Sequence, residues 1–338
     1  MLFTHWRQQY HIRSEHSISE GVSYSNQARS SKNRRGLNNE YFPEAMDGTS
    51  KMKDPNFTCI DFHTHLIPDR YLREMLERKQ EMFPGTGRPP SDYLEIGYPG
   101  SVKGLLTSMA RSGIWYSVVL PVARTPDKVE STNQWMRSVA LKNPQLIPFG
   151  TIHQDYTRIE EELEKVSQSG FKGIKVHLFY QSQNHNPRPS FLKKNFLLIP
   201  KNLERLGLIL VVDTYFPWDH GNDPETLEEL IALSEMFPKL RIVAAHMGSA
   251  MNWDVVTPFY GRDIFFDISF TLGILSNDII ESIIKTHGAD KILFGSDFPF
   301  RTPEKEIERF MALEIPKEDR IKILNLNAQN LLGLRKSF

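Results

Sequence analysis

"TCIDFHTH" (residues 58–65) is a short apolar run that ends in two histidines separated by one residue. Successive side chains of a β-strand point to opposite faces, so His63 and His65 would share one face of a strand here. Their Cβ atoms would then lie roughly 7 Å apart, which allows both imidazoles to bind one metal ion. The two histidines alone also fit a polar turn. The remaining sequence is needed to distinguish a metal site from such a turn.

Seven further apolar or β-branched runs follow, at 115–122, 146–153, 171–179, 208–215, 241–248, 264–270 and 291–297. The segments between them have helical periodicity with start and stop signals, as in "RIEEELEKVSQSG" (158–170) and "DPETLEELIALSEMFP" (223–238). Eight strand–helix units over about 280 residues predict an α/β fold of the (β/α)8 TIM-barrel type. A doubly wound open sheet is the alternative, but it normally has a glycine-rich turn where this chain has His-Thr-His.

The composition is typical of a globular domain and separates an N-terminal extension from it. The 338 residues are 40% hydrophobic and carry no formal net charge, which argues against nucleic acid or an anionic membrane as a partner. The single cysteine, Cys59, excludes an intramolecular disulfide and a multi-cysteine zinc site. Residues 1–54 are rich in Ser, Asn, Arg and His without periodicity, so we expect a disordered or loosely packed extension before a domain at 55–338. No run resembles a signal sequence or a membrane span, and we expect a cytoplasmic protein.

Polar residues gather at the carboxyl ends of the predicted strands, where barrels of this type carry their active sites. Of the eight histidines after residue 55, five lie at such ends, and three aspartates join them: His63, His65, His153, His177, His246, Asp213, Asp267 and Asp297. Because these strand ends are a small part of the chain, the clustering predicts one functional site at this face of the barrel.

A catalytic metal site needs about three protein ligands and an open position. Asp297 ends the last strand, which lies beside the first in a closed barrel, so it suits a third ligand that also takes a proton from metal-bound water. His177 would be a further ligand. Lys175, on the same face, would hold a substrate carboxylate or carry CO2 as a carbamate between two ions. His246, at the end of the sixth strand, suits an acid, a base or an oxyanion donor.

"DFHTH" (61–65), "FKGIKVH" (171–177), "AAHMG" (244–248) and "LFGSDFP" (293–299) together resemble the motifs of the amidohydrolase superfamily. The branch that this chain resembles is the amidohydrolase-2 group, which includes aminocarboxymuconate semialdehyde decarboxylase and related metal-dependent enzymes. The resemblance covers about residues 57–334. It implies a barrel with one or two divalent ions, in which His63, His65 and Asp297 match ligands and His246 matches a histidine that is often catalytic.

The chain departs from this pattern on the fifth strand, which usually ends in a histidine ligand. "LILVVDTYFPW" (208–218) places Asp213 there instead. Asp213 would then be a carboxylate ligand or contact the substrate, His177 would replace the missing ligand, or the metal would bind weakly. Zinc is the ion that we expect, with manganese, iron and nickel as alternatives.

Three functions follow from these residues. We expect a hydrolase of a small amide, lactone or ester, with metal-activated water and Asp297 as the base. The first alternative is a non-oxidative decarboxylase of an aromatic or unsaturated acid, with Lys175 or an arginine on the carboxylate. The second is a non-catalytic barrel that has lost its metal, which Asp213 would favour. The expected partner is a small-molecule substrate, and a homodimer is the default assembly.

Overall fold

A computed structural model of the chain describes residues 59–68, 70–73, 94–178, 190–193, 196–216, 221–222, 224–249 and 253–334. The predicted N-terminal extension (1–54) and its boundary lie outside these residues, so the division into an extension and a barrel domain stays a prediction. Among the described residues, no helix has both the length and the apolar character that a membrane crossing needs.

Parallel strands lie at all eight predicted positions. They are β1 (Cys59–Thr64), β2 (Ile114–Val119), β3 (Leu146–Pro148) with β4 (Gly150–Thr151), β5 (Gly173–His177), β6 (Ile209–Asp213), β9 (Ile242–Ala244), β10 (Phe265–Asp267) and β11 (Ile292–Leu293). The pairing order is β1-β2-β3 in one sheet and β4-β5-β6-β9-β10-β11 in the other. Because β3 and β4 are separated by one residue, they act as a single third strand.

The two sheets join into a closed barrel. At one seam, the Phe149 N–H donates to the Val119 carbonyl at 3.1 Å, which continues the β2–β3 pairing toward β4. At the other seam, the Phe62 N–H of β1 donates to the Phe294 carbonyl just after β11 at 2.8 Å. The predicted TIM-barrel architecture is therefore confirmed, and the first and last strands are neighbours as expected.

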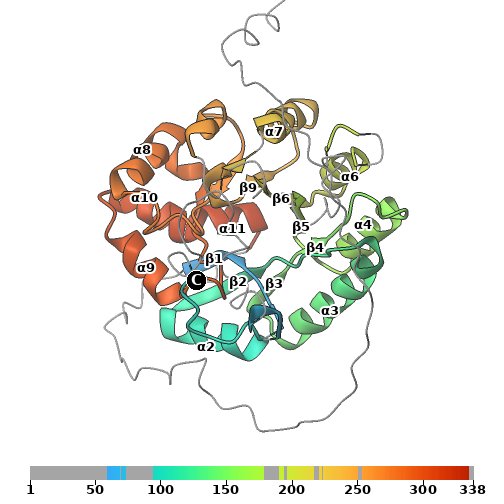
Figure 1. Ribbon diagram of the computed structural model, residues 1–338, viewed down its shortest axis with the longest axis horizontal. Coiled ribbons are helices and arrows are strands. Elements are labelled where there is room, and N and C mark those ends of the chain that lie inside the picture. The colour runs from blue at the N-terminus through green and yellow to red at the C-terminus, as the bar shows by residue number, and fades with distance from the viewer. Residues whose placement is uncertain are drawn as a thin grey trace, which may run out of the picture. The chain divides into compact units, whose positions relative to one another are not determined.

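Helices lie around the ring of strands (Figure 1). The longer ones are α2 (Val102–Ser112), α3 (Val129–Lys142), α4 (Ile159–Gln168), α6 (Leu198–Leu206), α7 (Pro224–Met236), α8 (Asn277–His287) and α9 (Pro303–Met311). A C-terminal run comprises α10 (Lys317–Ile321), the π-helical turn η7 (Lys322–Leu326) and α11 (Asn327–Leu332). Shorter elements are η2 (Pro126–Lys128), η4 (His246–Gly248), η5 (Trp253–Phe259), η6 (Ala289–Lys291), β7 (Tyr215–Phe216) and β8 (Gly221–Asn222).

Local sequence signals explain where the helices begin and end. In α2, the Ser101 hydroxyl accepts the Gly104 N–H at 3.1 Å, and Gly113 ends the helix with a φ of 70°. Helix α4 occupies the predicted segment and stops before Gly170, whose φ is 78°. Helix α7 starts with Pro224 in its first turn, as its sequence predicts.

The core has two layers, because both faces of the barrel strands are buried. The outer layer lies between the strands and the surrounding helices. The inner layer fills the barrel, where Phe62 and Phe149 pack edge to face with ring centroids 5.9 Å apart. Residues of α11 pack against this inner layer. The apolar filling leaves the carboxyl ends of the strands for the polar residues of the site.

Candidate metal centre and the cationic cluster beside it

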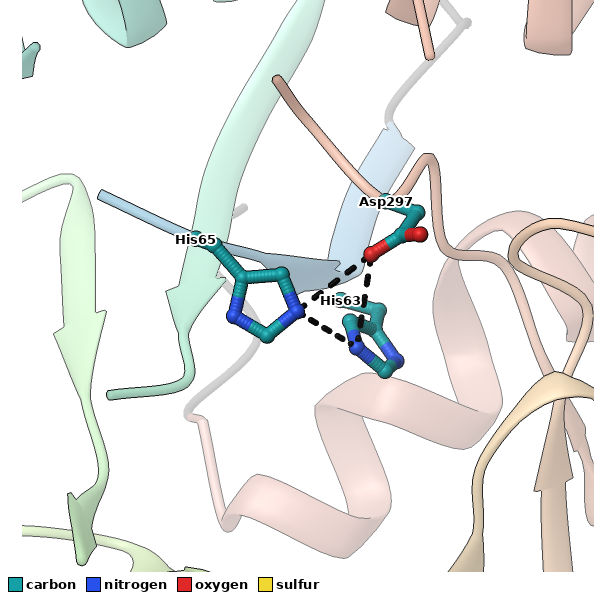
Figure 2. A group of neighbouring side chains, drawn as sticks. All are labelled: His63, His65 and Asp297. Atoms are coloured by element: carbon teal, nitrogen blue, oxygen red, sulfur yellow. Dashed lines mark hydrogen bonds and ion pairs between the residues drawn. The ribbon is translucent and has the colours of Figure 1, made fainter. Parts of the chain in front are cut away.

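Three of the predicted ligands meet where β1 and the segment after β11 lie side by side (Figure 2). The Nε2 atoms of His63 and His65 are 3.1 Å apart. Asp297 Oδ1 lies 3.7 Å from the Nε2 of His63 and 3.3 Å from that of His65. The side chains of His63, His65 and Asp297 are 0%, 12% and 8% exposed, so the group is almost completely buried. Their possible ligand atoms all lie within 4.8 Å of one another.

Irregular backbone at the ends of the first and last strands orients these side chains toward one another. The pairing of β1 with β2 shifts register between Asp61 and Thr64, next to the two histidines. Asp297 has a φ of 63°, a left-handed conformation that non-glycine residues rarely adopt and that is frequent at functional sites. Its N–H donates to the His63 carbonyl at 2.9 Å, and Asp61 accepts hydrogen bonds from the N–H and hydroxyl of Ser296. The last strand is thereby fastened to the first.

The outer hydrogen bonds of the two histidines determine which nitrogen faces the group. His65 Nδ1–H donates to the Leu120 carbonyl at 2.7 Å, which leaves its Nε2 unprotonated in the neutral ring. His63 Nδ1–H donates to Asp267 at 2.9 Å, and burial lowers the pKa of His63 to about 4 against the opposing effect of Asp267. With both rings neutral, two nitrogen lone pairs and a carboxylate oxygen converge. A divalent cation fits this donor set.

Asp267, for which the sequence predicts only a place at a strand end, is hydrogen-bonded to both histidine-bearing segments of the site. One of its oxygens accepts the His63 Nδ1–H, while the other accepts the N–H groups of His246 at 3.1 Å and Ser269 at 3.2 Å, together with the Ser269 hydroxyl. Burial alone would raise its pKa, but the His63 contact and the other donors hold the pKa well below its usual range. Asp267 therefore orients His63 as a carboxylate behind a metal-binding imidazole does.

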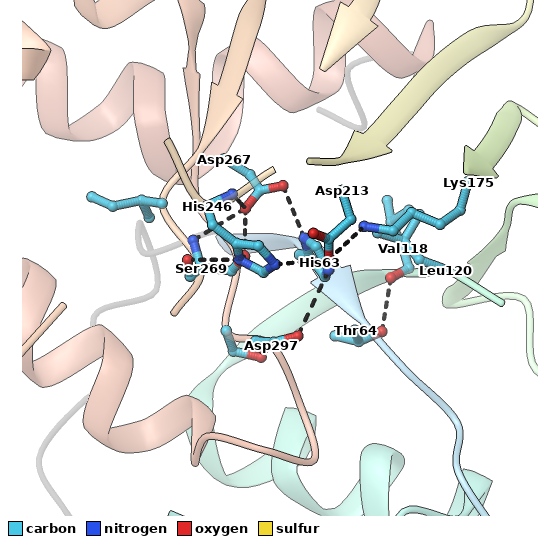
Figure 3. Close-up of polar contacts among 12 residues, drawn as sticks. His63, Thr64, Val118, Leu120, Lys175, Asp213, His246, Asp267, Ser269 and Asp297 are labelled. Carbon is cyan, nitrogen blue, oxygen red and sulfur yellow. Dashed lines mark hydrogen bonds and ion pairs between the residues drawn. The ribbon is translucent and has the colours of Figure 1, made fainter. Parts of the chain in front are cut away.

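A second cluster surrounds Asp213 at the ends of β5, β6 and β9 (Figure 3). Asp213 Oδ2 lies 3.3 Å from the Nε2 of both His177 and His246, and 3.9 Å from Lys175 Nζ. Burial alone would raise the pKa of Asp213, but the two imidazoles and the ammonium hold it well below its usual range. Burial lowers the pKa of His177 to about 3, so that ring is neutral.

His246 has an acceptor at each ring nitrogen. Its Nδ1–H donates to the Ser269 carbonyl at 3.0 Å, and its Nε2 faces Asp213. Burial alone would lower the pKa of His246, but the hydrogen bond to Asp213 and the charges of nearby aspartates raise it to about 9. The ring stacks on His63 with centroids 4.8 Å apart. An imidazolium therefore lies directly beside the candidate metal ligands.

The structure thus divides the predicted site residues into two groups. His63, His65 and Asp297 form the candidate ligand group. Another set of possible ligand atoms that lie within 4.8 Å of one another comes from His63, His246 and Asp267. In that set, Asp267 already accepts hydrogen bonds from neighbouring N–H groups. In the described part of the chain, neither of these two sets of possible metal ligands includes His177, Lys175 or Asp213. The proposed ligand role of His177 stays a prediction, and its observed neighbour is Asp213.

Comparison with known proteins identifies the family. Residues 60–334 match the model of the amidohydrolase family. The chain belongs to this family. The predicted superfamily membership is therefore confirmed, and the match covers the whole barrel with both clusters of the site.

Several of the similar proteins are decarboxylases, and a probable 2-pyrone-4,6-dicarboxylic acid hydrolase is also similar in structure. Gamma-resorcylate decarboxylase of Polaromonas sp. (strain JS666 / ATCC BAA-500) is 32% identical over 123 residues, which are 31% of this chain and 37% of the relative. The match thus spans little more than a third of that relative's length. The crystal structure of a 2,6-dihydroxybenzoate decarboxylase with 2,6-dihydroxybenzoate has a TM-score of 0.62 and 20% identity, over 82% of this chain and 99% of that one.

A third similar structure contains a metal ion. The dihydroxybenzoic acid decarboxylase of Polaromonas sp. JS666, with bound manganese and the inhibitor 2-nitroresorcinol, has a TM-score of 0.60 and 18% identity, over 83% of this chain and 98% of that one. At such identities the structural likeness shows the shared barrel fold. The activity and the ions of these proteins are properties of the relatives.

Proposed function

We propose that this protein is a metal-dependent, non-oxidative decarboxylase of a small aromatic carboxylic acid. Decarboxylation was the alternative in the sequence analysis, and the names of the relatives support it better than the hydrolase that we expected first. In this proposal His63, His65 and Asp297 hold one divalent ion. Manganese in a related structure supports a divalent metal, whereas zinc stays a prediction from the donor types.

The observation that carries the proposal is the pair of basic side chains beside the ligand group. Lys175 and His246 both lie inside the barrel next to Asp213, with His246 stacked on His63. The reacting group of an amide, ester or lactone is neutral and gains little from buried cations before it reacts. An aromatic acid is an anion, and buried basic side chains attract it as a whole and compensate for its desolvation, whether or not they contact the carboxylate that is lost.

The reaction needs a bond cleavage and a proton. The bond between the ring carbon and the carboxylate breaks, CO2 leaves, and the electron pair stays on the ring carbon, which takes up one proton. His246 carries a proton on each nitrogen and suits the donor, after which solvent reprotonates it. A bound divalent ion would act as a Lewis acid that orients the substrate and neutralises charge. Water is not consumed.

Incubation of the manganese-loaded protein with 2,6-dihydroxybenzoate tests the proposal. We expect release of CO2 and formation of resorcinol in equal amounts, measured by gas analysis and chromatography. Asp297→Asn should abolish the release, while Asp290→Asn, at an exposed aspartate, should leave it unchanged. Hydrolysis of esters or lactones without CO2 release from any hydroxybenzoate would contradict the proposal and favour the hydrolase.

A further inference from the structure

We propose that Lys175 binds a second acidic oxygen of the substrate, one that is not part of the carboxylate lost as CO2. The inference rests on the proposed function and specifies its substrate class: an aromatic acid with a further ionisable oxygen on the ring. Lys175 would be the residue that selects for that oxygen.

The position of Lys175 places its ammonium inside the barrel. Lys175 is the central residue of β5 and pairs with Thr151 of β4 and Val211 of β6. Its neighbours Ile174 and Val176 pack in the outer core layer, so the lysine points to the opposite face, into the barrel. Figure 3 shows the side chain reaching toward Asp213 and the candidate metal centre.

The ammonium of Lys175 is completely buried and lacks a hydrogen-bond acceptor among the described residues. The nearest carboxylate oxygen, of Asp213, is 3.9 Å away, which is beyond hydrogen-bond length. That same oxygen is closer to the imidazoles of His177 and His246. A lysine has three N–H donors, and burying them unsatisfied destabilises the fold. The Lys175 ammonium can therefore donate a hydrogen bond to an oxygen of a bound substrate.

Energetics indicate which oxygen this is. An ion pair with the reacting carboxylate would be strongest before the reaction and would vanish as CO2 leaves without charge. Such a contact stabilises the ground state more than the transition state and slows the chemical step. An oxygen that stays on the ring keeps its contact with Lys175 throughout, so binding improves without a penalty on the chemistry. This differs from our sequence-based expectation, in which Lys175 held the carboxylate itself.

The matching chemistry is an acidic oxygen, which either a phenolic hydroxyl or a second carboxylate can supply. Paired probes distinguish the two sources. Resorcinol against phenol, neither of which can lose CO2, isolates a second hydroxyl. Isophthalate against benzoate isolates a second carboxylate. The Michaelis constants for 2,6-dihydroxybenzoate and 2-hydroxybenzoate extend the comparison to reacting acids.

Calorimetric binding to the manganese-loaded full chain, with parallel steady-state kinetics, tests the proposal. We expect the wild type to bind at least one doubly substituted probe about 10-fold or more tightly than its singly substituted partner, as one hydrogen bond to a charged group provides. Lys175→Met should reduce this preference to within about twofold and raise KM far more than it lowers kcat. Lys175→Arg should retain part of it. Lys172→Met, at the residue directly before β5, is the matched control and should behave as wild type.

Two results would overturn the proposal. One is a wild-type protein without either preference. The other is a Lys175→Met protein that keeps the full preference with an unchanged manganese content. Either result with continued CO2 release leaves the decarboxylase proposal intact. Absence of CO2 release from the wild type contradicts the proposed function. The resorcinol and phenol titrations still test whether Lys175 binds a second oxygen, because they need no turnover. Should Lys175→Met not fold, Lys175→Gln provides the same comparison.

Discussion

Asp267→Asn would change the protonation of a metal ligand without changing the shape of the side chain. The oxygen of Asp267 that faces His246 and Ser269 receives three donors. An asparagine has one amide oxygen and one NH2 group, so these donors fix the oxygen on their side and turn the NH2 toward His63 Nδ1. The Nδ1 atom must then accept a hydrogen bond, and the ring proton moves to Nε2. That nitrogen is the one that points at His65 and Asp297.

The expected loss of metal affinity follows from this geometry. Changes to carboxylates behind metal-binding histidines typically weaken metal binding by about 10- to 100-fold. In Asp267→Asn the misplaced proton sits on the ligand atom itself and has to be displaced before the ion can bind. We therefore expect an effect near the upper end, about 100-fold, which corresponds to about 2.7 kcal/mol.

Titration with Mn²⁺, followed by electron paramagnetic resonance of the free ion, measures the dissociation constant directly and needs no substrate. Asp290→Asn removes the same charge from an exposed position and should bind Mn²⁺ like wild type. Urea unfolding shows whether both variants keep the fold. A dissociation constant for folded Asp267→Asn within about twofold of wild type would refute the assigned role of Asp267.

Four further predictions concern the metal, its ligands and the barrel core. Treatment with a chelator should abolish CO2 release and added Mn²⁺ should restore it, and full activity of the metal-free protein would contradict this. Asp297→Asn should reduce both Mn²⁺ binding and turnover by at least about 100-fold, because one of the three converging donors is neutralised. His177→Ala should keep Mn²⁺ affinity within about threefold, since its ring contacts Asp213, and a loss of 10-fold or more would make His177 a ligand. Phe62→Ala should lower the free energy of unfolding, measured in urea, by about 3–5 kcal/mol, because the buried ring packs on Phe149. A change below about 1 kcal/mol would show that the inner layer collapses into the space left by the ring.

The barrel was predictable because its strands bury both faces and therefore appear as apolar runs of uniform length. The sixth run shows the limit of this signal. "RIVAAHMG" (241–248) looks like one continuous strand, but β9 ends at Ala244 and the chain turns into η4. His246 and Met247 have φ values of 56° and 54° there. A left-handed turn at non-glycine residues leaves no trace in hydrophobic periodicity, so the strand end was misplaced by a few residues.

The contacts within the site were less predictable than its location. Alternation along a strand determines the face on which a side chain lies, and it predicts that His63 and His65 lie together, while closure of the barrel predicts Asp297 beside them. Alternation does not determine the stagger between distant strands. That stagger determines which carboxylate contacts which imidazole. Asp213 and Asp267 both end strands, yet one lies among imidazoles and an ammonium while the other orients His63.

The aspartate on the fifth strand was the reason to consider a barrel that has lost its metal. In the structure, Asp213 lies outside the group of converging ligand atoms, so its identity does not interrupt that group. A buried carboxylate at this point still requires nearby cations, and His246 and Lys175 provide them. Because Asp213 approaches the ammonium of Lys175 only to 3.9 Å, it compensates the charge without occupying the N–H donors. The change on the fifth strand therefore fits a site that binds an anionic substrate, with one cation near the reacting carbon and another free to hold an oxygen that remains on the product.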